Sequence, residues 1–252
     1  MQNRWLLTPQ FFDVPEPALA KAAPEGVDVN GPHDIPDRSA ASMAAVHRPI
    51  ADFVAVAAAD NSRPVSVAGD CCASLPVLAG LQRAGIAPTL VWIDAHGDFN
   101  TPETSPSQFL GGMPLAMMVG RGPQWMCESV GLATLPEESV WLIDGRDLDP
   151  LERQALDASA IRRTGMAGLK TLRITGPVWV HLDCDVMDST EVPGFQYPVP
   201  NGPSVVDTVA ALTIFAAAND IAAVSLSGWT DDLDPSGATA RACKQALDAL
   251  VT

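Results

Sequence analysis

Two short acidic motifs contain residue types that can ligate a metal or transfer a proton. The first, DAHGD, occupies residues 94–98, and the second, DCD, occupies residues 183–185. Each follows an apolar run typical of a buried strand, PTLVWI and GPVWVHL respectively. Alternate side chains of an extended segment face the same way, so we expect Asp94, His96 and Asp98 to converge.

The second motif has the same spacing. If it is extended, Asp183 and Asp185 point together and Cys184 points away. Crowded carboxylates raise one another's pKa and need a counter-charge, which a pair of divalent ions supplies. A carboxylate-rich site with one imidazole suits Mn²⁺ better than Zn²⁺. The alternative is that these aspartates cap helices and turns, but two such motifs at strand ends favour the metal site.

For the two motifs to lie together, the strands that precede them must belong to one sheet and end at the same edge of it. Apolar runs predict strands over residues 65–68, 88–94, 140–144, 177–183 and 221–226, and helical patterns cover 71–85, 147–159, 204–218 and 237–251. This alternation implies βαβ crossovers and a mainly parallel sheet, hence the α/β class. We expect one domain over residues 1–252, with irregular surface structure in the Pro- and Asp-rich residues 8–40.

Composition narrows the function classes. The 252 residues carry 15 Lys and Arg against 30 Asp and Glu, a net charge of −15, which argues against a nucleic-acid partner. The longest uncharged run, residues 104–120, is interrupted by prolines and glycines, so we expect no membrane-spanning helix. No secretory signal is evident, and five cysteines form no regular framework. We therefore expect a cytoplasmic protein with reduced thiols.

From about Ser66 onward the chain resembles the arginase (ureohydrolase) family of dinuclear manganese amidinohydrolases, most specifically in DAHGDFNTPE and HLDCDVMD. The resemblance implies a three-layer α/β/α fold, a small guanidino substrate, a homo-oligomer and two Mn²⁺ ions per chain. It implies metal ligands at Asp94, His96, Asp98, Asp183 and Asp185. Asp94 and Asp183 would bridge the ions, and a hydroxide held between the ions would attack the guanidinium carbon. Asp98, catalytic together with Asp94, would relay a proton to the leaving amine.

Two further segments resemble substrate-binding parts of the family. VWLIDGRDLDPLE implies that Asp149 and Glu152 hold an α-amino group, and NTPETSPSQFLGG implies that Asn100, Ser105 and Ser107 bind an α-carboxylate. The substrate would then be arginine or an analogue. The alternative is that Asp149 caps the following helix and that the serines are turn residues.

The chain departs from the family at a metal ligand. Where the family has a His in a Gly-Gly-Asp-His motif, the sequence is Ala-Gly-Asp-Cys, ending at Cys71. A thiolate is a soft ligand and Mn²⁺ is a hard ion. Cys71 therefore either ligates and favours another divalent metal, or remains a thiol and weakens one metal position. A third possibility is a buried cysteine that only packs as a small apolar residue.

Two substrate-side residues of the family are also missing. Gly111 stands where arginases carry a proton-shuttling loop His, and His181, two residues before Asp183, is expected to be a core or supporting histidine. The Glu that holds the guanidinium after the last strand is replaced by Ser225, Ser227 or Trp229. Aspartates of the next loop, Asp231 or Asp232, are candidates to compensate for it.

These departures favour N-hydroxyarginine, cleaved to ornithine and hydroxyurea, over arginine, cleaved to ornithine and urea. A hydroxyguanidine is less basic than a guanidine, so it needs the missing Glu and the missing His less. Two other functions remain open. One is an inactive homologue that binds a metal or an amino acid, and the other is a single-zinc, deacetylase-like amide hydrolase, although such enzymes use paired histidines.

Overall fold

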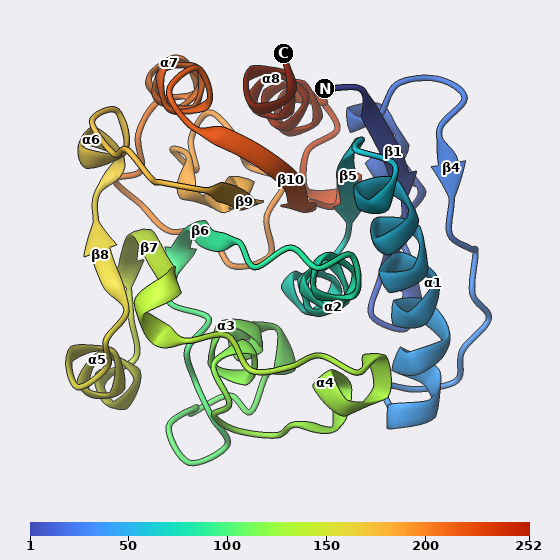
Figure 1. Ribbon diagram of the computed structural model, residues 1–252. Helices are drawn as coiled ribbons and strands as arrows, with labels where there is room; N and C mark the ends of the chain where they lie inside the picture. The colour runs from blue at the N-terminus through green and yellow to red at the C-terminus, as the bar shows by residue number, and fades with distance from the viewer.

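Eight parallel strands form the central sheet of the computed structural model, which describes residues 1–252 (Figure 1). Their order across the sheet is β4-β1-β5-β10-β9-β6-β7-β8. In that order the strands span Asp28–Val29, Asn3–Leu7, Arg63–Ala68, Asp220–Ser227, Pro177–Asp183, Thr89–His96, Val140–Asp147 and Arg162–Thr164. A separate antiparallel hairpin joins β2 (Gln10–Phe11) to β3 (Val14–Pro15).

Helices cover both faces of the sheet, so the three-layer α/β/α prediction is confirmed (Figure 1). Helices α1, α2 and α4 pack together on one face and α6, α7 and α8 on the other. The eight helices, α1 to α8, span Ala40–Ala59, Leu75–Arg83, Pro114–Met118, Trp125–Val130, Pro150–Asp157, Met166–Leu169, Val205–Ala216 and Ala238–Val251. No helix is long and apolar enough to span a membrane.

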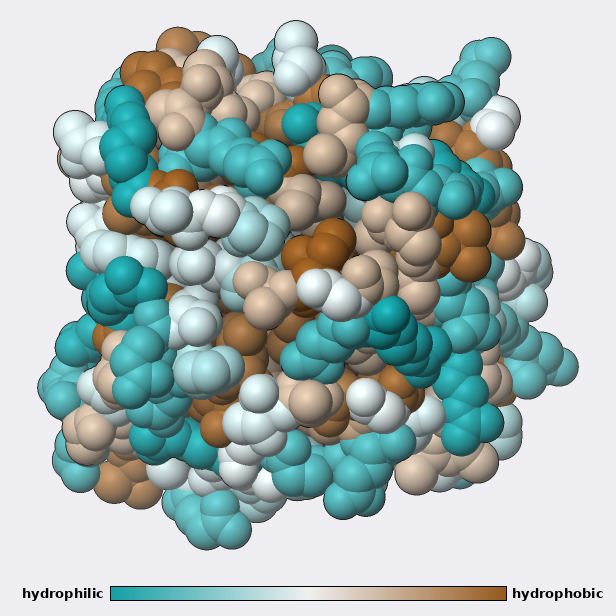
Figure 2. Space-filling view, in the orientation of Figure 1, coloured by the Kyte–Doolittle hydropathy of each residue, from teal (hydrophilic) through white to brown (hydrophobic).

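The continuous apolar runs are explained by burial of both faces of each central strand. In β6, Leu90 and Trp92 belong to one core cluster, while Val91 and Ile93 belong to the cluster on the other side of the sheet. A strand covered on both faces needs apolar residues at every position, unlike a half-exposed strand. On the outer surface, Figure 2 shows hydrophilic residues around most of the outline, with hydrophobic residues in separate groups.

All five predicted strands are present. Residues 8–39 contain only two-residue strands and one short 3₁₀ helix, as expected, but the prediction that they lie on the surface is partly wrong, because Phe12, Leu19 and Ala22 are buried in the core. The predicted helix over 71–85 begins as a 3₁₀ turn before α2. Elements outside the predicted set include β1, β8 and α1. Helix α1 contains Pro49, which normally argues against a helix interior, but its apolar side packs on α2.

Buried His47 on α1 leads to a prediction about stability and pH. Burial lowers its pKa from 6.5 to about 4, and its Nδ1 has no hydrogen-bond partner. Between these pH values the unfolded chain binds a proton that the folded chain does not, so stability falls as the pH decreases. Over this interval the loss from His47 is about 3 kcal/mol, from ~1.4 kcal/mol per pKa unit.

Urea unfolding between pH 7 and about pH 4 measures this effect. The variant His47→Leu removes the titrating group and keeps an apolar side chain in the core. Its free energy of unfolding should therefore decline less steeply with falling pH than that of the unsubstituted protein, because all other titrating groups are common to both. Parallel curves for the two proteins would contradict the assignment.

Candidate metal and substrate site

A cavity of about 780 Å³ opens at the carboxyl ends of the central strands. Ligand sites in open parallel sheets occur at this edge, where β5, β6 and β9 end. The cavity is lined by all the candidate metal ligands, catalytic residues and substrate-binding residues: Cys71, Asp94, His96, Asp98, Asn100, Ser105, Ser107, Asp149, Glu152, Asp183 and Asp185.

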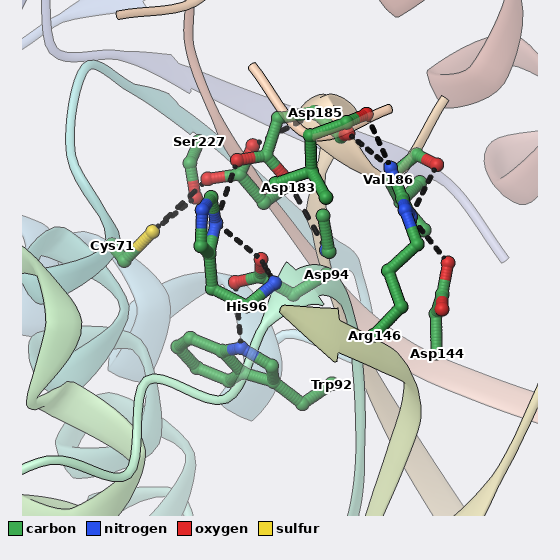
Figure 3. Close-up of polar contacts among 12 residues, drawn as sticks. Cys71, Trp92, Asp94, His96, Asp144, Arg146, Asp183, Asp185, Val186 and Ser227 are labelled. Atoms are coloured by element: carbon green, nitrogen blue, oxygen red, sulfur yellow. Dashed lines mark hydrogen bonds and ion pairs between the residues drawn. The ribbon is translucent and has the colours of Figure 1, made fainter. Parts of the chain in front are cut away.

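Cys71, Asp94 and Asp183 form the first group of side chains suited to hold a metal ion. Their ligand atoms lie within 4.8 Å of one another, and Cys71 Sγ lies 3.1 Å from Asp183 Oδ2 (Figure 3). Asp98 lies beside this group and feels the charges of Asp94 and Asp183. Its Oδ2 is buried without a hydrogen-bond partner. Because a buried unpaired carboxylate oxygen is costly, a divalent cation is a partner that suits it.

Asp94, His96 and Asp185 form the second group, which shares Asp94 with the first. His96 Nδ1 lies 2.9 Å from Asp185 Oδ2 and 3.4 Å from Asp94 Oδ1 (Figure 3). A pair of neighbouring ions requires a shared ligand, and the Asp94 carboxylate is placed to be that ligand. Oxygen, one nitrogen and one sulfur are available as donors.

The crowded, buried carboxylates of these two ligand groups favour the binding of positive charge. Burial and the neighbouring Asp185 carboxylate raise the pKa of Asp183 to about 7, and burial together with Asp94 raises that of Asp185 to about 6. Burial also raises the pKa of Asp94 and Asp98. Burial lowers the pKa of His96, but hydrogen bonds with Asp185 and Asp94 outweigh it and raise the value to about 12. Two divalent ions would offset four carboxylates here, so the donor set fits a dinuclear site.

Asp98 reaches the site by a turn, and the prediction that residues 94–98 are extended is wrong at this point. Strand β6 ends at His96, and Asp98 has a left-handed backbone with φ +48°. Glu152 Oε1 accepts the Phe99 N–H at 2.8 Å, and a Cβ at Gly97 would lie only 2.5 Å from that oxygen. The absence of a side chain at Gly97 therefore allows Glu152 to hold the turn that aims Asp98 inward.

Asp183 and Asp185 also converge through a turn, not through an extended strand. Strand β9 ends at Asp183, and residues 184–186 form a 3₁₀ turn. Asp183 Oδ1 accepts the Asp185 N–H at 3.0 Å, and Asp185 Oδ1 accepts the Ala95 N–H at 3.2 Å. Cys184 points away from the site into the core, as expected.

The substrate-binding candidates line the cavity but also make local structural bonds. Asn100 Nδ2 donates to Asp149 Oδ2 at 3.0 Å, and Glu152 Oε2 accepts the Asp149 N–H at 3.1 Å at the start of α5. The Ser105 and Ser107 hydroxyls accept backbone N–H groups of their own loop. These residues therefore do cap a helix or stabilise a turn, and the same hydrogen bonds position their side chains on the cavity wall.

The structure gives a physical reason for the glycine at position 111. A Cβ built on Gly111 would lie 2.4 Å from the Phe109 ring, which stands against it. The same ring packs on Tyr197 with centroids 5.2 Å apart, and both aromatic residues line the cavity. A histidine at Gly111 therefore requires Phe109 to move.

The residues suggested to replace the missing Glu, or to compensate for it, lie in different places at the end of β10. Trp229 and Asp232 line the cavity, whereas Asp231 pairs with Lys21 and Ser225 lies beneath the cavity. Of the two loop aspartates, only Asp232 is thus placed to meet a ligand.

His181 lies in the core beneath the site and supports it, in line with the expectation of a core or supporting histidine. It is buried between Ser225 Oγ and Ser227 Oγ, each 2.9 Å from a ring nitrogen, and Ser227 Oγ lies 3.1 Å from Cys71 Sγ. Burial lowers the pKa of His181 to about 3, so its ring is neutral. Its ring stacks on Trp92, with centroids 3.8 Å apart.

Some supporting residues escaped sequence reasoning. Trp92 Nε1 donates to Asp94 Oδ2 at 3.0 Å, and Arg146 packs its guanidinium against the Asp185 turn (Figure 3). The only available signal was their place inside or just after an apolar run. That signal does not distinguish a core residue from one that orients a ligand.

Comparisons with known proteins point to one family. The Arginase family model matches residues 17–252. A Streptomyces lavendulae N(omega)-hydroxy-L-arginine amidinohydrolase is 35% identical over 144 residues, 55% of this chain and 50% of that protein. Bacillus subtilis arginase is 30% identical over 202 residues, 75% of this chain and 68% of that protein. The alignment thus spans half of the Streptomyces protein and about two thirds of the Bacillus one.

Solved structures agree in fold. An arginase from Bacillus cereus superposes with a TM-score of 0.84 at 24% identity, covering 100% of this chain and 98% of that chain. An arginase from Bacillus subtilis superposes with a TM-score of 0.82 at 25% identity and the same coverage.

Proposed function

Because the chain belongs to the arginase family, we propose that it is a metal-dependent amidinohydrolase that cleaves the guanidino group of arginine or an arginine analogue. The observation that carries this proposal is the pair of overlapping ligand groups that share Asp94 at the floor of one cavity. Six side chains would hold two divalent ions: Cys71, Asp94, His96, Asp98, Asp183 and Asp185. When bound, such ions polarise a water for attack on the guanidino carbon.

The other cavity residues bind and orient the substrate. Asp149, held by Asn100, meets the α-amino group, with Glu152 behind it, and Ser105 and Ser107 meet the α-carboxylate. Asp98 hands a proton to the departing amine, because burial raises the pKa of its carboxyl and so lets it carry a proton nearer neutral pH than an exposed carboxyl does. Asp232 lines the same cavity and is the candidate to compensate for the missing Glu.

We propose N-hydroxyarginine as the preferred analogue. Two observations support it: a histidine at position 111 would require the Phe109 ring to move, and no Glu follows β10. The name of the Streptomyces relative points to the same substrate. A hydroxyguanidine carries less positive charge at neutral pH and yields a less basic leaving group, so it tolerates both losses.

Steady-state kinetics on both substrates test this preference. We expect kcat/KM for N-hydroxyarginine to exceed that for arginine by about tenfold or more, which corresponds to ~1.4 kcal/mol of transition-state stabilisation. A higher kcat/KM for arginine would overturn the substrate assignment. Two bound metals without turnover of any guanidino compound would favour an inactive homologue. A single bound zinc with amide hydrolysis would favour a deacetylase-like enzyme, although His96 is the one histidine that lines the cavity.

Cys71 leads to a prediction about metal preference. A thiolate favours Zn²⁺ over Mn²⁺, and an alcohol does not. Cys71→Ser keeps the size of the side chain and its place beside Ser227. We expect the ratio of Zn²⁺ to Mn²⁺ affinity to fall by about tenfold, or ~1.4 kcal/mol.

Competitive metal titration with a chromophoric chelator measures that ratio. Cys72→Ser is the matched control, because Cys72 is buried next in sequence but donates to the Leu110 carbonyl outside the ligand groups. An unchanged ratio in Cys71→Ser would mean that the sulfur does not ligate.

A further inference from the structure

Arg146, which follows Gly145 near the end of β7, directs its guanidinium at the turn that carries Asp185. Nη1 donates to the Val186 carbonyl at 3.0 Å and to the Asp144 carboxylate, and Nη2 donates to the Asp185 carbonyl at 3.4 Å. Figure 3 shows Arg146 between Asp144 and this turn. The Arg146 and Asp144 side chains are only 17% and 16% exposed, so the ion pair is largely protected from solvent.

The same guanidinium holds a second segment, the loop over residues 187–203. Nη2 also donates to the Val199 carbonyl at 3.0 Å, and Nε donates to the Pro200 carbonyl at 3.1 Å. All five N–H bonds of Arg146 therefore have acceptors. Residues 194–198 of this loop form part of the cavity wall.

One side chain thus connects a metal-ligand turn to a wall of the substrate cavity. The turn matters because Asp185 makes two contacts with the end of β6: its Oδ1 accepts the Ala95 N–H, and its Oδ2 lies 2.9 Å from His96 Nδ1. Removing the guanidinium would leave four carbonyls and one carboxylate without a donor. A lysine keeps the charge, but its three N–H bonds come from one point and cannot reproduce the planar fork.

We propose that Arg146 is a positioning residue that presets Asp185 for the metal position of His96 and holds residues 194–198 against the cavity. The metal part of this inference rests on the proposed function, and the loop part does not. Arg146 belongs to neither ligand group and does not line the cavity, so its effect is transmitted through the backbone of residues 185–186 and 199–200.

The variant Arg146→Lys tests this inference, with Arg63→Lys as the matched control. Arg63 also joins distant segments, donating to the Ile221 and Leu250 carbonyls, but it stands at the start of β5, away from the cavity. Isothermal titration with Mn²⁺ should show that one of the two metal equivalents loses affinity by about 10–100-fold in Arg146→Lys, the range for residues that orient metal ligands. The other equivalent should be retained, and Arg63→Lys should keep both.

Hydrogen exchange of the metal-free proteins supplies a second readout that needs neither metal nor turnover. Amides of residues 187–203 should exchange faster in Arg146→Lys and not in Arg63→Lys. Unchanged exchange together with two unweakened metal equivalents would overturn the inference, as would equal losses in Arg63→Lys.

If Arg146→Lys does not fold, the variant Asp144→Asn tests the inference instead. This variant removes the carboxylate that holds the guanidinium towards the four carbonyls, so a smaller loss at one metal equivalent is expected, and no loss overturns the inference. Failure of the unsubstituted protein to bind metal would count against the proposed function, while loop exchange still tests Arg146.

Discussion

Asp183→Ala should lose both metal binding and turnover. Asp183 belongs to the first ligand group, and its Oδ1 accepts the N–H of Asp185, which belongs to the second. Its loss therefore removes a ligand from one metal position and a hydrogen bond that holds the ligand turn of the other. Metal analysis after dialysis and an assay at saturating Mn²⁺ should both give background values. Retained turnover would refute the site.

This loss should not arise from unfolding. Burial and the Asp185 charge raise the pKa of Asp183 to about 7, well above the unfolded value. A raised carboxyl pKa means that the folded metal-free protein resists ionising Asp183, which lowers its stability as the pH rises above about 4. In chelator at pH 8, Asp183→Ala should therefore unfold at the same or a higher urea concentration than the unsubstituted protein.

Asp188→Ala is the matched control. Asp188 follows the same strand, but it is only half-buried and accepts hydrogen bonds from Thr190 outside the cavity. Its metal content and kcat should equal those of the unsubstituted protein. A comparable loss in this variant would mean that the segment as a whole, and not the Asp183 carboxylate, is sensitive to substitution.

Asp98→Asn should reduce kcat by about 10²–10⁴-fold, the range for loss of a group that transfers a proton in the transition state. An asparagine keeps one oxygen for metal binding, but it has no carboxyl proton to donate. Saturating metal separates the two roles, because it compensates for weakened binding and does not restore proton transfer. The expected result is near-normal metal content with a low kcat.

The control for Asp98→Asn is Glu103→Gln, which removes an exposed carboxylate from the loop that follows. It should leave kcat unchanged. If Asp98→Asn turned over normally at full metal occupancy, Asp98 would be a ligand only, and another group would have to protonate the leaving amine.

The fold class followed from sequence because its signal is local. A strand buried on both faces must be apolar where it is covered, and β6, β7 and β9 show this in the uninterrupted apolar runs over residues 90–93, 140–143 and 178–180. Helix α1 was not predicted, because its Pro49 breaks the local pattern and packing against α2, α4 and β5 stabilises the helix. Strand order is likewise non-local: β10, last in sequence, pairs with β5 and β9 in the middle of the sheet.

For the candidate site, sequence by itself determined which residue types follow the strands, and hence that carboxylates, one imidazole and a thiol meet at one edge. Only the tertiary structure decided how they converge. Asp98 is turned inward by Glu152 from α5, and the Asp185 turn is held by Arg146 from β7. Strand alternation is a property of neighbouring residues, whereas the shape of a turn depends on hydrogen bonds from residues about 40–50 positions away. Those partners are adjacent only after the sheet has formed.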